Sequence, residues 1–565
     1  MAAALTGREA FAGAGTLTGG EAVVRALAAH GVTDAFGIPG THNLELYRHL
    51  RPYGIRHTTP RHEQGAGYAA DGYARVSGRP GVVVTTTGPA LLNIAAAVGQ
   101  AYSDSVPLLV VSPGMPLRHP RQSTGLLHEM RSQTEALRGV AAFSHRVASV
   151  DEIGAAVARA FTLFRTQRPR PVHVEVPLDL MEAAEPVGAV RLAPPVGPAV
   201  PEPAALGAAA EALWGARRPA LILGGGARAA SAACLALAEE LGAPVVTTAN
   251  GKGVVDERHP LSLGVSLHLP AVQKSLADAD VILAVGTELA ESDVWGPLPA
   301  LTGTLIRVDL DPAQMYAGLP ADVALVGDAG PLLEALLTAY REGTARQGGP
   351  GRAGPGRADL PQDGPRRGAD PADVTALRTA RDNETRAQDA HRLPYLRAMR
   401  RVLAEDAVIT SDSAQCCYYG ALPHLPLGPE GRYLHPSGFG TLGYALPAAI
   451  GAKTACPERQ VVGLSGDGGL QFSVQELATA AQLPLPIPVV VFDNGGYGEI
   501  REQMAARGDT PAAVDLPSVD LSALARAYGG HGTTVRSPEE LADALSEALN
   551  TSGPTLITVP EENPR

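Results

Sequence analysis

Two glycine-rich loops in the last third of the chain limit its fold more than any other feature. The run VVGLS enters Gly466-Asp467-Gly468-Gly469, and the run IPVVVFD enters Asn494-Gly495-Gly496, so each indicates a buried strand that ends in a loop. Residues 473–483 between them have helical periodicity, with Ser473 as the expected N-cap. A right-handed crossover of this kind brings both loops to the carboxyl edge of one parallel sheet, where α/β proteins bind ligands.

The residue types in these loops indicate which ligand they bind. Asp467 offers an anionic oxygen and Asn494 a neutral one, which together suit octahedral Mg²⁺. Gly466, Gly468 and Gly469 allow backbone N–H groups to approach a diphosphate, whose charge the following helix N-terminus favours. The alternative is a pair of unrelated Asp-Gly and Asn-Gly turns, but the crossover helix between them favours a metal–diphosphate site.

The rest of the chain alternates short apolar runs with helical stretches, which is typical of parallel α/β layers. Its 565 residues, 45% of them apolar, are enough for three cores. The sequence therefore predicts three doubly wound parallel-sheet domains, at residues 16–185, 200–342 and 390–562. Residues 343–372 are rich in Gly, Pro and Arg, so we expect a flexible linker there. Strands are expected at 35–40, 81–88, 107–113, 171–177, 219–227, 280–289, 304–312, 407–415, 460–469 and 487–496, and a helix at 42–50.

Composition argues against several other classes of protein. The formal net charge is −12 and the basic residues are scattered, unlike the concentrated positive surface of a nucleic-acid-binding protein. No run approaches the roughly 18 apolar residues of a membrane span. The cysteines lack zinc-type spacing, and the N-terminal segment lacks the basic start and apolar run of a signal peptide. We therefore expect a cytoplasmic protein without nucleic-acid or membrane partners.

The segment GDGGLQFSVQELATAAQ, followed by PVVVFDNGGYGEI, resembles the thiamine-diphosphate motif of the acetolactate synthase and pyruvate decarboxylase superfamily. The resemblance covers residues 17–340 and 390–560 and implies a pyrimidine-binding, a middle and a diphosphate-binding domain. It also implies that Asp467, Asn494 and the carbonyl of Gly496 hold Mg²⁺, and that Tyr497 contacts the cofactor. The family usually has Asn-Asn where this chain has Asp493-Asn494, which keeps the second, ligating position.

Two further segments match the same family. Residues 61–75, RHEQGAGYAADGYAR, resemble the segment whose glutamate hydrogen-bonds the cofactor's aminopyrimidine ring and promotes loss of a proton, a role that falls on Glu63. The alternative for Glu63 is a surface carboxylate favoured by a helix dipole. Around residues 435–451, the resemblance implies that Leu442 props the cofactor into its bent, catalytic shape and that Gly440 offers backbone contacts. Gln415 is expected near the diphosphate.

Side chains that face the substrate are expected on three loops. Thr41 and His42 follow the strand at 35–40, His128 and Glu129 lie where decarboxylase relatives carry paired histidines, and Glu499 follows the metal loop. His128 is the expected catalytic proton donor, with Glu129 beside it. Glu129 and Glu499 are also the expected partners of a cationic substrate tail. Each of these residues has an alternative as an ordinary surface side chain.

The segments FGIPGTHNLELYR, PRHEQGAG and LLHE resemble in particular the bacterial 5-guanidino-2-oxopentanoate (2-ketoarginine) decarboxylases, although Gly88-Pro89-Ala90 stands where the family has Gly-Pro-Gly. This resemblance implies decarboxylation of a 2-oxo acid to an aldehyde and CO₂, with thiamine diphosphate and Mg²⁺ as cofactors. One alternative is an acetolactate-synthase-type carboligase that joins the decarboxylated intermediate to a second carbonyl compound. Another is a cofactor-binding relative without catalysis, against which Glu63, Asp467 and Asn494 argue.

The resemblance also implies a homo-oligomer, a dimer or a tetramer, in which Glu63 of one subunit meets Asp467 of another. In the middle domain, Gly224-Gly225-Gly226 follows an expected strand and resembles a nucleotide-binding turn. A lone glycine turn leaves open whether that domain binds FAD or nothing.

Overall fold

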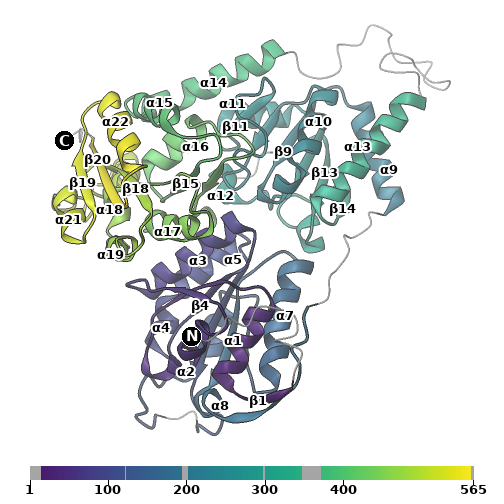
Figure 1. The fold of residues 1–565 in the computed structure, drawn as a ribbon. Helices are drawn as coiled ribbons and strands as arrows, with labels where there is room; N and C mark the ends of the chain where they lie inside the picture. Colours follow the sequence, from purple (N-terminus) through teal and green to yellow (C-terminus); the bar gives the residue numbers. More distant parts are fainter. Residues whose placement is uncertain (1–13, 121–122, 194–201, 297–299, 347–370, 562–565) are drawn as a thin grey trace. The chain divides into compact units, whose positions relative to one another are not determined.

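The computed structural model describes residues 14–120, 123–193, 202–296, 300–346 and 371–561. The chain forms two compact units, one of Met1–Val196, Val408–Gln415 and Leu434–Arg565, the other of Gly197–Ala407 and Cys416–Tyr433. Figure 1 shows their helices and strands. Three six-stranded parallel sheets confirm the predicted α/β class, and they fall within the three predicted domain ranges.

The first sheet has the strand order β3-β2-β4-β5-β7-β6. Successive residues of a strand face opposite sides, so Val82 and Val84 join one core and Val83 joins another. Helices α1 (Gly19–Ala29), α2 (Leu44–Leu50) and α7 (Glu152–Thr166) cover the side of Val82, and α3 (Glu63–Ser77) and α5 (Ala95–Ser103) cover the side of Val83. The strands are β2 (Asp34–Gly37), β3 (Arg56–Thr58), β4 (Gly81–Val84), β5 (Leu108–Gly114), β6 (Phe143–Arg146) and β7 (Val172–Pro177).

The C-terminal sheet repeats this topology. Its order, β16-β15-β17-β18-β20-β19, is the same as that of the first sheet when the strands of each are counted along the chain. The first and last thirds of the chain therefore share one strand layout. Its strands are β15 (Val408–Ser411), β16 (Arg432–Leu434), β17 (Val461–Gly466), β18 (Pro486–Asp493), β19 (His531–Thr534) and β20 (Gly553–Pro560). Its longer helices are α17 (Ala445–Ala455), α20 (Gly498–Ala506), α21 (Leu521–Ala527) and α22 (Pro538–Ala548).

The middle sheet, in the second unit, has the order β11-β10-β9-β12-β13-β14, which is the strand order of dinucleotide-binding folds. In the Gly224-Gly225-Gly226 turn, the space beside the glycines is occupied by Gly286. A Cβ at Gly224 or Gly226 would lie 2.2 or 2.9 Å from atoms of Gly286. The turn thus serves close packing of two loops. The strands are β9 (Pro219–Leu223), β10 (Val245–Thr247), β11 (Ser262–Val265), β12 (Val281–Val285), β13 (Thr304–Asp309) and β14 (Val323–Val326). Helices here are α9 (Pro203–Gly215), α10 (Ser231–Leu241), α11 (Pro270–Ala277), α12 (Glu291–Val294) and α13 (Ala329–Arg346).

Helices α3 and α17 join the two outer sheets into one unit. Small residues let their backbones approach, because a Cβ at Gly72 would lie 2.3 Å from the carbonyl oxygen of Ala448, and one at Gly451 would lie 1.7 Å from that of Ala69. The apolar residues of both helices belong to one buried core that continues into both sheets. The Gly- and Ala-rich segments GAGYAADG and ALPAAIGA are therefore packing surfaces as well as motifs.

Two expectations need correction. Residues 473–483 do not form one helix: η6 (Val474–Glu476) is a 3-10 turn and α19 (Leu477–Ala480) is a single short turn. Ser473 makes no side-chain cap bond, and the Glu476 carboxylate binds backbone N–H groups of residues 61 and 62 instead. The expected linker at 343–372 is helical at both ends, since α13 extends to Arg346 and α14 (Pro371–Asp389) starts at Pro371. Its central part lies outside the described residues.

Among the described residues, no helix is both long enough and apolar enough to cross a membrane.

Candidate active site

The structure brings Asp467 and Asn494 together. Asp467 opens the short helix α18 (Asp467–Leu470) after β17, Asn494 follows β18, and the Asn494 N–H donates to Asp467 Oδ1 at 3.3 Å. Asp467 is only 6% exposed. Burial and the neighbouring Asp493 carboxylate raise the pKa of Asp467 to about 6. A divalent cation would favour the ionised carboxylate, because it supplies the missing opposite charge.

A hydrogen bond from its nitrogen orients the side-chain amide of Asn494. Its Nδ2 donates to Oε1 of Gln415 at 3.4 Å. Its Oδ1 is buried and has no hydrogen-bond partner within the described ranges. A buried carbonyl oxygen without a partner is costly unless a ligand satisfies it. A desolvated carboxylate beside an unsatisfied amide oxygen is a donor set that fits Mg²⁺.

The glycines of the two loops let the loops touch. A Cβ at Gly468 would lie 3.1 Å from the Tyr497 ring and 3.2 Å from the carbonyl oxygen of Gly496, the third expected metal ligand. Gly496 itself has φ +143°, and a Cβ there would lie 2.1 Å from the Val514 carbonyl oxygen, to which the Tyr497 N–H donates at 2.9 Å. Larger residues at either glycine would push the expected ligands apart.

Asp412, just after β15, ties together several segments around this site. Its carboxylate accepts hydrogen bonds from the Gly443 N–H at 3.0 Å and from the Ser465 hydroxyl at 3.0 Å. A Cβ at Gly469 would lie 3.1 Å from Asp412 Oδ2, and burial raises the pKa of Asp412 to about 6. Asp412 was not among the expected site residues. Its signal in the sequence was its place in the expected strand segment 407–415, three residues before Gln415.

The loop before α17 carries Gly440 and Leu442, and it is held at both ends. Thr441 donates from its N–H and its hydroxyl to Oε1 of Gln100, at 3.1 and 2.9 Å, while Gly443 is bound to Asp412. Nothing lies within 4 Å of a Cβ built on Gly440, whose φ is +63°. Leu442, between these two anchored residues, is partly exposed, and Gly440, just before Thr441, is exposed, as contact with a flat ring would require.

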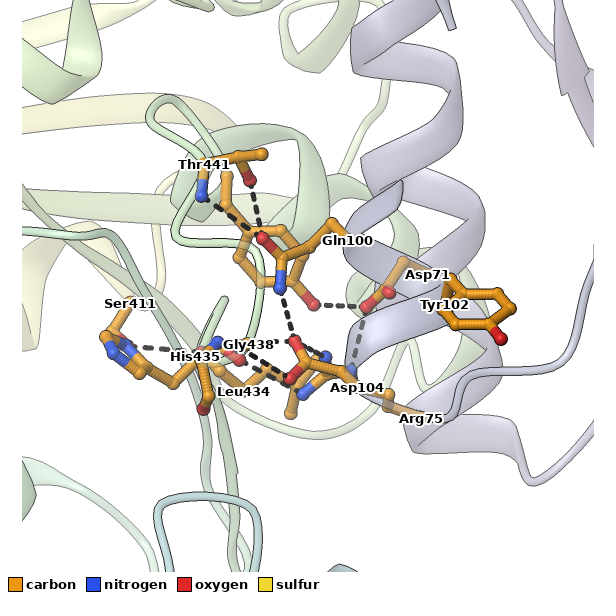
Figure 2. A network of polar contacts seen from close by, with 12 residues as sticks. Asp71, Arg75, Gln100, Tyr102, Asp104, Ser411, Leu434, His435, Gly438 and Thr441 are labelled. Atoms are coloured by element: carbon orange, nitrogen blue, oxygen red, sulfur yellow. Dashed lines mark hydrogen bonds and ion pairs between the residues drawn. The ribbon is translucent and has the colours of Figure 1, made fainter. Parts of the chain in front are cut away.

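An ion-pair network contacts this loop (Figure 2). Arg75 of α3 contacts Asp71 at 2.9 Å and Asp104 at 2.7 Å, and the Tyr444 hydroxyl donates to Asp71. Asp104 also accepts from Gln100 at 2.6 Å and from the N–H groups of residues 437 and 438 at 3.3 and 3.2 Å. The network therefore connects α3 and α5 to the loop that carries Gly440.

Glu63 is the first residue of α3 and is 9% exposed. The Asn93 amide donates to its Oε2 at 2.9 Å, which leaves Oε1 with no hydrogen-bond partner among the residues that the structure describes. The hydroxyl of Tyr47 hydrogen-bonds His57 at 3.0 Å, and burial together with the nearby Glu63 raises the pKa of that hydroxyl. Asn93 was not expected from the sequence, because it lies on a separate helix, α4 (Pro89–Asn93).

Glu476 fixes the backbone that precedes Glu63. Its carboxylate is fully buried and accepts from the N–H groups of Arg61 and His62 at 3.1 and 3.0 Å, and from the Thr479 hydroxyl at 2.7 Å. Burial raises the pKa of Glu476. The segment that follows the expected diphosphate loop thus holds the backbone just before the expected activating glutamate.

His42 and His128 are joined through Thr87. The Thr87 hydroxyl lies 2.6 Å from His42 Nδ1 and 3.1 Å from His128 Nδ1, and the ring centroids are 5.5 Å apart. His128 has φ +62°, a conformation that is rare outside glycine and often marks functional sites. Burial and the neighbouring His128 lower the pKa of His42. Thr87 is fully buried and was not expected from the sequence.

The other expected substrate residues lie in different surroundings. Thr41 is exposed on the 3-10 turn η2 (Thr41–Asn43). Glu129 braces its own loop, since its carboxylate contacts His119 Nε2 at 2.6 Å and accepts from the N–H groups of Thr124 and Gly125 at 2.8 and 2.9 Å. Both Glu129 oxygens are thus used by the protein.

Glu499 belongs to the metal-loop cluster. It lies in the first turn of α20, and Gln415 Nε2 donates to it at 3.5 Å while Gln503 Nε2 donates at 3.0 Å. Gln415 in turn contacts Asn494. The Gln415 side chain therefore links Glu499 to the expected metal ligand Asn494. Glu499 is partly exposed.

Three parallel-sheet domains with glycine loops at the carboxyl edge of the last sheet define a class of cofactor-dependent α/β enzyme. The chain matches the descriptions "Thiamine pyrophosphate enzyme, N-terminal TPP binding domain" at residues 17–136, "central domain" at 206–336 and "C-terminal TPP binding domain" at 415–559. It belongs to the thiamine pyrophosphate enzyme family, and its cofactor is thiamine diphosphate, the same compound under its other name.

Curated relatives cover almost the whole chain. It is 43% identical to a probable 2-ketoarginine decarboxylase, AruI, of Pseudomonas aeruginosa, over 96% of this chain and 94% of that protein. It is 33% identical to the acetolactate synthase large subunit of Parasynechococcus marenigrum, over 96% and 87% of the two chains. The large subunit of acetolactate synthase isozyme 3 of Escherichia coli is 32% identical, over 94% and 92%.

Proposed function

We propose that this chain decarboxylates 5-guanidino-2-oxopentanoate to the corresponding aldehyde and CO₂, with thiamine diphosphate and Mg²⁺. The observation that carries the proposal is the histidine pair joined by Thr87, in the same unit as the cofactor loops. The reaction releases CO₂ and consumes one proton at the carbon that bore the carboxylate, so a decarboxylase needs a proton donor there. The name of the 43% identical relative supports the substrate.

The cofactor supplies a nucleophilic carbon and an electron sink for the 2-oxo acid. Asp467, the Asn494 amide oxygen and the Gly496 carbonyl would hold its Mg²⁺. Glu63 Oε1 would hold a proton for the cofactor's ring nitrogen, while Asn93 keeps the carboxylate in place through Oε2. Gly440 and Leu442 would position the ring.

The Thr87 hydroxyl has a single proton, so it donates to one imidazole Nδ1 and accepts from the other. The imidazole that accepts at Nδ1 must carry its own proton at Nε2 when it is neutral. One of the two histidines therefore directs an Nε2–H away from Thr87. This nitrogen delivers a proton to carbon when the ring is protonated, and the ring returns to its neutral form as the aldehyde is released. We assign this donor role to the His42–His128 pair.

A panel of 2-oxo acids tests the proposal. The protein is incubated with thiamine diphosphate and Mg²⁺, CO₂ release is followed, and the organic product is identified by mass. We expect faster turnover of 5-guanidino-2-oxopentanoate than of pyruvate, with the aldehyde as product. Turnover of pyruvate alone would refute the substrate, and full activity after dialysis against EDTA would refute the metal.

Glu499 provides a prediction about the cationic tail of the substrate. Glu499→Gln removes a partly exposed carboxylate next to the metal loop, so KM for the guanidino acid should rise about 10-fold, the effect of one charge-assisted hydrogen bond. KM for pyruvate should stay within about twofold. Glu502→Gln, on the exposed side of the same helix, is the matched control and should change neither. Equal effects on both substrates would contradict a role for Glu499 in recognising the guanidinium group.

The second candidate function is carboligation, in which the decarboxylated intermediate attacks a second carbonyl compound. The acetolactate synthases at 33% and 32% identity favour it. A product that is heavier than the aldehyde by one acyl unit would establish it. The Thr87-linked histidines favour the aldehyde because a nearby proton donor competes with the second carbonyl compound.

We further propose that the enzyme works in the cytoplasm as a homo-oligomer, with Glu63 of one subunit serving the metal site of another. None of the four cysteines forms a disulfide bond, which suits a reducing compartment. Mixing two inactive variants, Glu63→Gln and Asp467→Ala, tests the shared site, because a mixed dimer would recover one intact active site.

A further inference from the structure

Gln133 is the first residue of the short helix α6 (Gln133–Arg138), and it is only 2% exposed. Its Oε1 accepts from the Gly88 N–H at 2.8 Å. Its Nε2 donates to the carbonyl oxygen of Pro113 at 2.7 Å and to the Ser112 hydroxyl at 3.3 Å. The Gly88 N–H can only donate and the Pro113 carbonyl can only accept, so these partners fix the orientation of the amide. Gln133 thereby ties the loop after β4 to the carboxyl end of β5.

The hydrogen bond to Gly88 fixes the peptide group that joins Thr87 to Gly88. Thr87 is the residue whose hydroxyl links His42 and His128. A Cβ at Gly88 would lie 2.6 Å from the His128 carbonyl oxygen and 2.9 Å from the His128 Cβ. Two consecutive residues therefore contact His128, Thr87 through its hydroxyl and Gly88 through its backbone. A rotation of this peptide group would disturb both contacts.

The backbone on both sides of this contact has an uncommon conformation. Gly88 has φ +61° and His128 has φ +62°. For a residue with a side chain such a conformation costs energy, and it persists only where the surrounding structure holds it. The Gly88 N–H is buried, so without the Gln133 amide it would lose its partner at a cost that is larger than that of the bond itself. The loop would relax to avoid that cost.

A second hydrogen-bonded group lies behind Gln133. The Ser112 hydroxyl, on β5, lies 2.8 Å from Nε2 of His173, on β7. His173 Nδ1 lies 2.7 Å from the Ser144 hydroxyl, on β6. Burial lowers the pKa of His173 to about 3, so its ring is neutral at pH 7. A buried polar network whose members are all hydrogen-bonded is rigid, so Gln133 has a fixed support in the interior of the first sheet.

We infer that Gln133 is a positioning residue for the proton donor. It holds the peptide group between Thr87 and Gly88 so that the Thr87 hydroxyl joins His42 and His128. This role rests on the proposed function, in which the histidine pair supplies a proton to carbon. Gln133 acts through Thr87 and not by contact with the substrate. The role explains why an amide is buried at a position where an apolar side chain would avoid the cost of desolvation.

A double-mutant cycle with Thr87→Val tests whether Gln133 acts through Thr87. Gln133→Met keeps the length of the side chain but removes the amide. It should lower kcat for aldehyde formation about 10-fold, the effect of one hydrogen bond to a buried group, with KM within about twofold. In the Thr87→Val background the same substitution should change kcat by less than about twofold, because the link between the histidines is already absent. Gln167→Met, an exposed glutamine at the end of α7, is the matched control and should change neither value. Equal losses in both backgrounds would overturn the proposal.

Gln133→Glu is a second variant, which carries the test if Gln133→Met does not fold. A protonated carboxyl group offers one acceptor and one O–H donor, the same pattern as the amide. An ionised carboxylate cannot donate to the Pro113 carbonyl oxygen. Burial raises the pKa of such a carboxyl group, so the matching neutral form is present at low pH and is lost as the pH rises through the raised pKa. The ratio of the variant's kcat to that of the wild type should therefore fall about 10-fold between about pH 5 and about pH 9. A ratio that does not change with pH would contradict the role of these hydrogen bonds.

The same measurements separate this role from the proposed function. Each ratio is determined with the 2-oxo acid that the wild type turns over fastest. If that acid is not 5-guanidino-2-oxopentanoate but the coupling to Thr87 is present, only the proposed substrate fails. If Thr87→Val lowers kcat and Gln133→Met does not, only the role of Gln133 fails. If Thr87→Val leaves kcat unchanged, the assignment of the proton donor to the histidine pair fails, and the role of Gln133 fails with it.

Discussion

Glu63→Gln should lower kcat about 10²- to 10⁴-fold, the range for loss of a positioned general acid–base. The substituted amide can still accept the Asn93 hydrogen bond at its retained oxygen, so the first turn of α3 should keep its structure. It cannot hold a proton at the position of Oε1, the atom that we assign to proton transfer. The loss should therefore appear in kcat, with KM for the 2-oxo acid nearly unchanged.

Steady-state CO₂ release measures the loss, and tryptophan fluorescence during cofactor titration measures binding. We expect the affinity for thiamine diphosphate to stay within about 10-fold, since one neutral hydrogen bond to the ring remains. Asn93→Ser is a second variant: it frees the carboxylate without removing it, and its effect on kcat should be smaller than that of Glu63→Gln. If Glu63→Gln keeps more than a tenth of the wild-type kcat, Glu63 is not the group that moves the proton.

The α/β class could be predicted because its evidence is local. Buried parallel strands are short apolar runs such as those at 81–84 and 461–466, and helices between them have their own periodicity. Strand order is not local. The reversal at β2 and β4, or at β9 and β12, depends on which neighbours pair, and strands of three residues such as β3 and β10 carry almost no periodic signal.

The same distinction separates the site residues that were expected from those that were missed. Asp467 and Asn494 stand in short, continuous motifs. The glycines of these motifs indicate a close approach between the backbone and a ligand. Thr87 lies 45 and 41 residues from the histidines that it joins. Asp412 binds Gly443, from the loop before α17, and Ser465, from strand β17. No spacing rule connects residues of this kind, because the sheet topology alone brings them together.

The segment 473–483 shows how tertiary contacts override a local pattern. SVQELATAAQL has the periodicity of one helix, but Glu476 lies fully buried, with its carboxylate on the N–H groups of Arg61 and His62. Satisfying those donors also satisfies a carboxylate that would otherwise be costly to bury. The segment accordingly adopts a 3-10 turn and a short helical turn.

Arg75→Met should reduce the free energy of unfolding by about 3–5 kcal/mol, the cost of leaving buried charges without their partner. Arg75 is the counter-ion of both Asp71 and Asp104, whose side chains are each only 1% exposed. Burial already raises the pKa of Asp71, and Arg75 opposes that rise. Without the guanidinium, two buried carboxylates would face each other across the contact between α3 and α5 (Figure 2).

Urea unfolding, followed by circular dichroism, measures this change in the first unfolding transition. Arg79→Met, an exposed arginine just beyond the same helix, is the control and should shift stability by less than about 0.5 kcal/mol. Adding Asp104→Asn to Arg75→Met should restore part of the loss, because it removes one of the two unpaired charges. Since Asp104 also binds the loop that carries Gly440, Arg75→Met should weaken cofactor binding too. A loss below about 1 kcal/mol would mean that the network orders this loop without stabilising the fold.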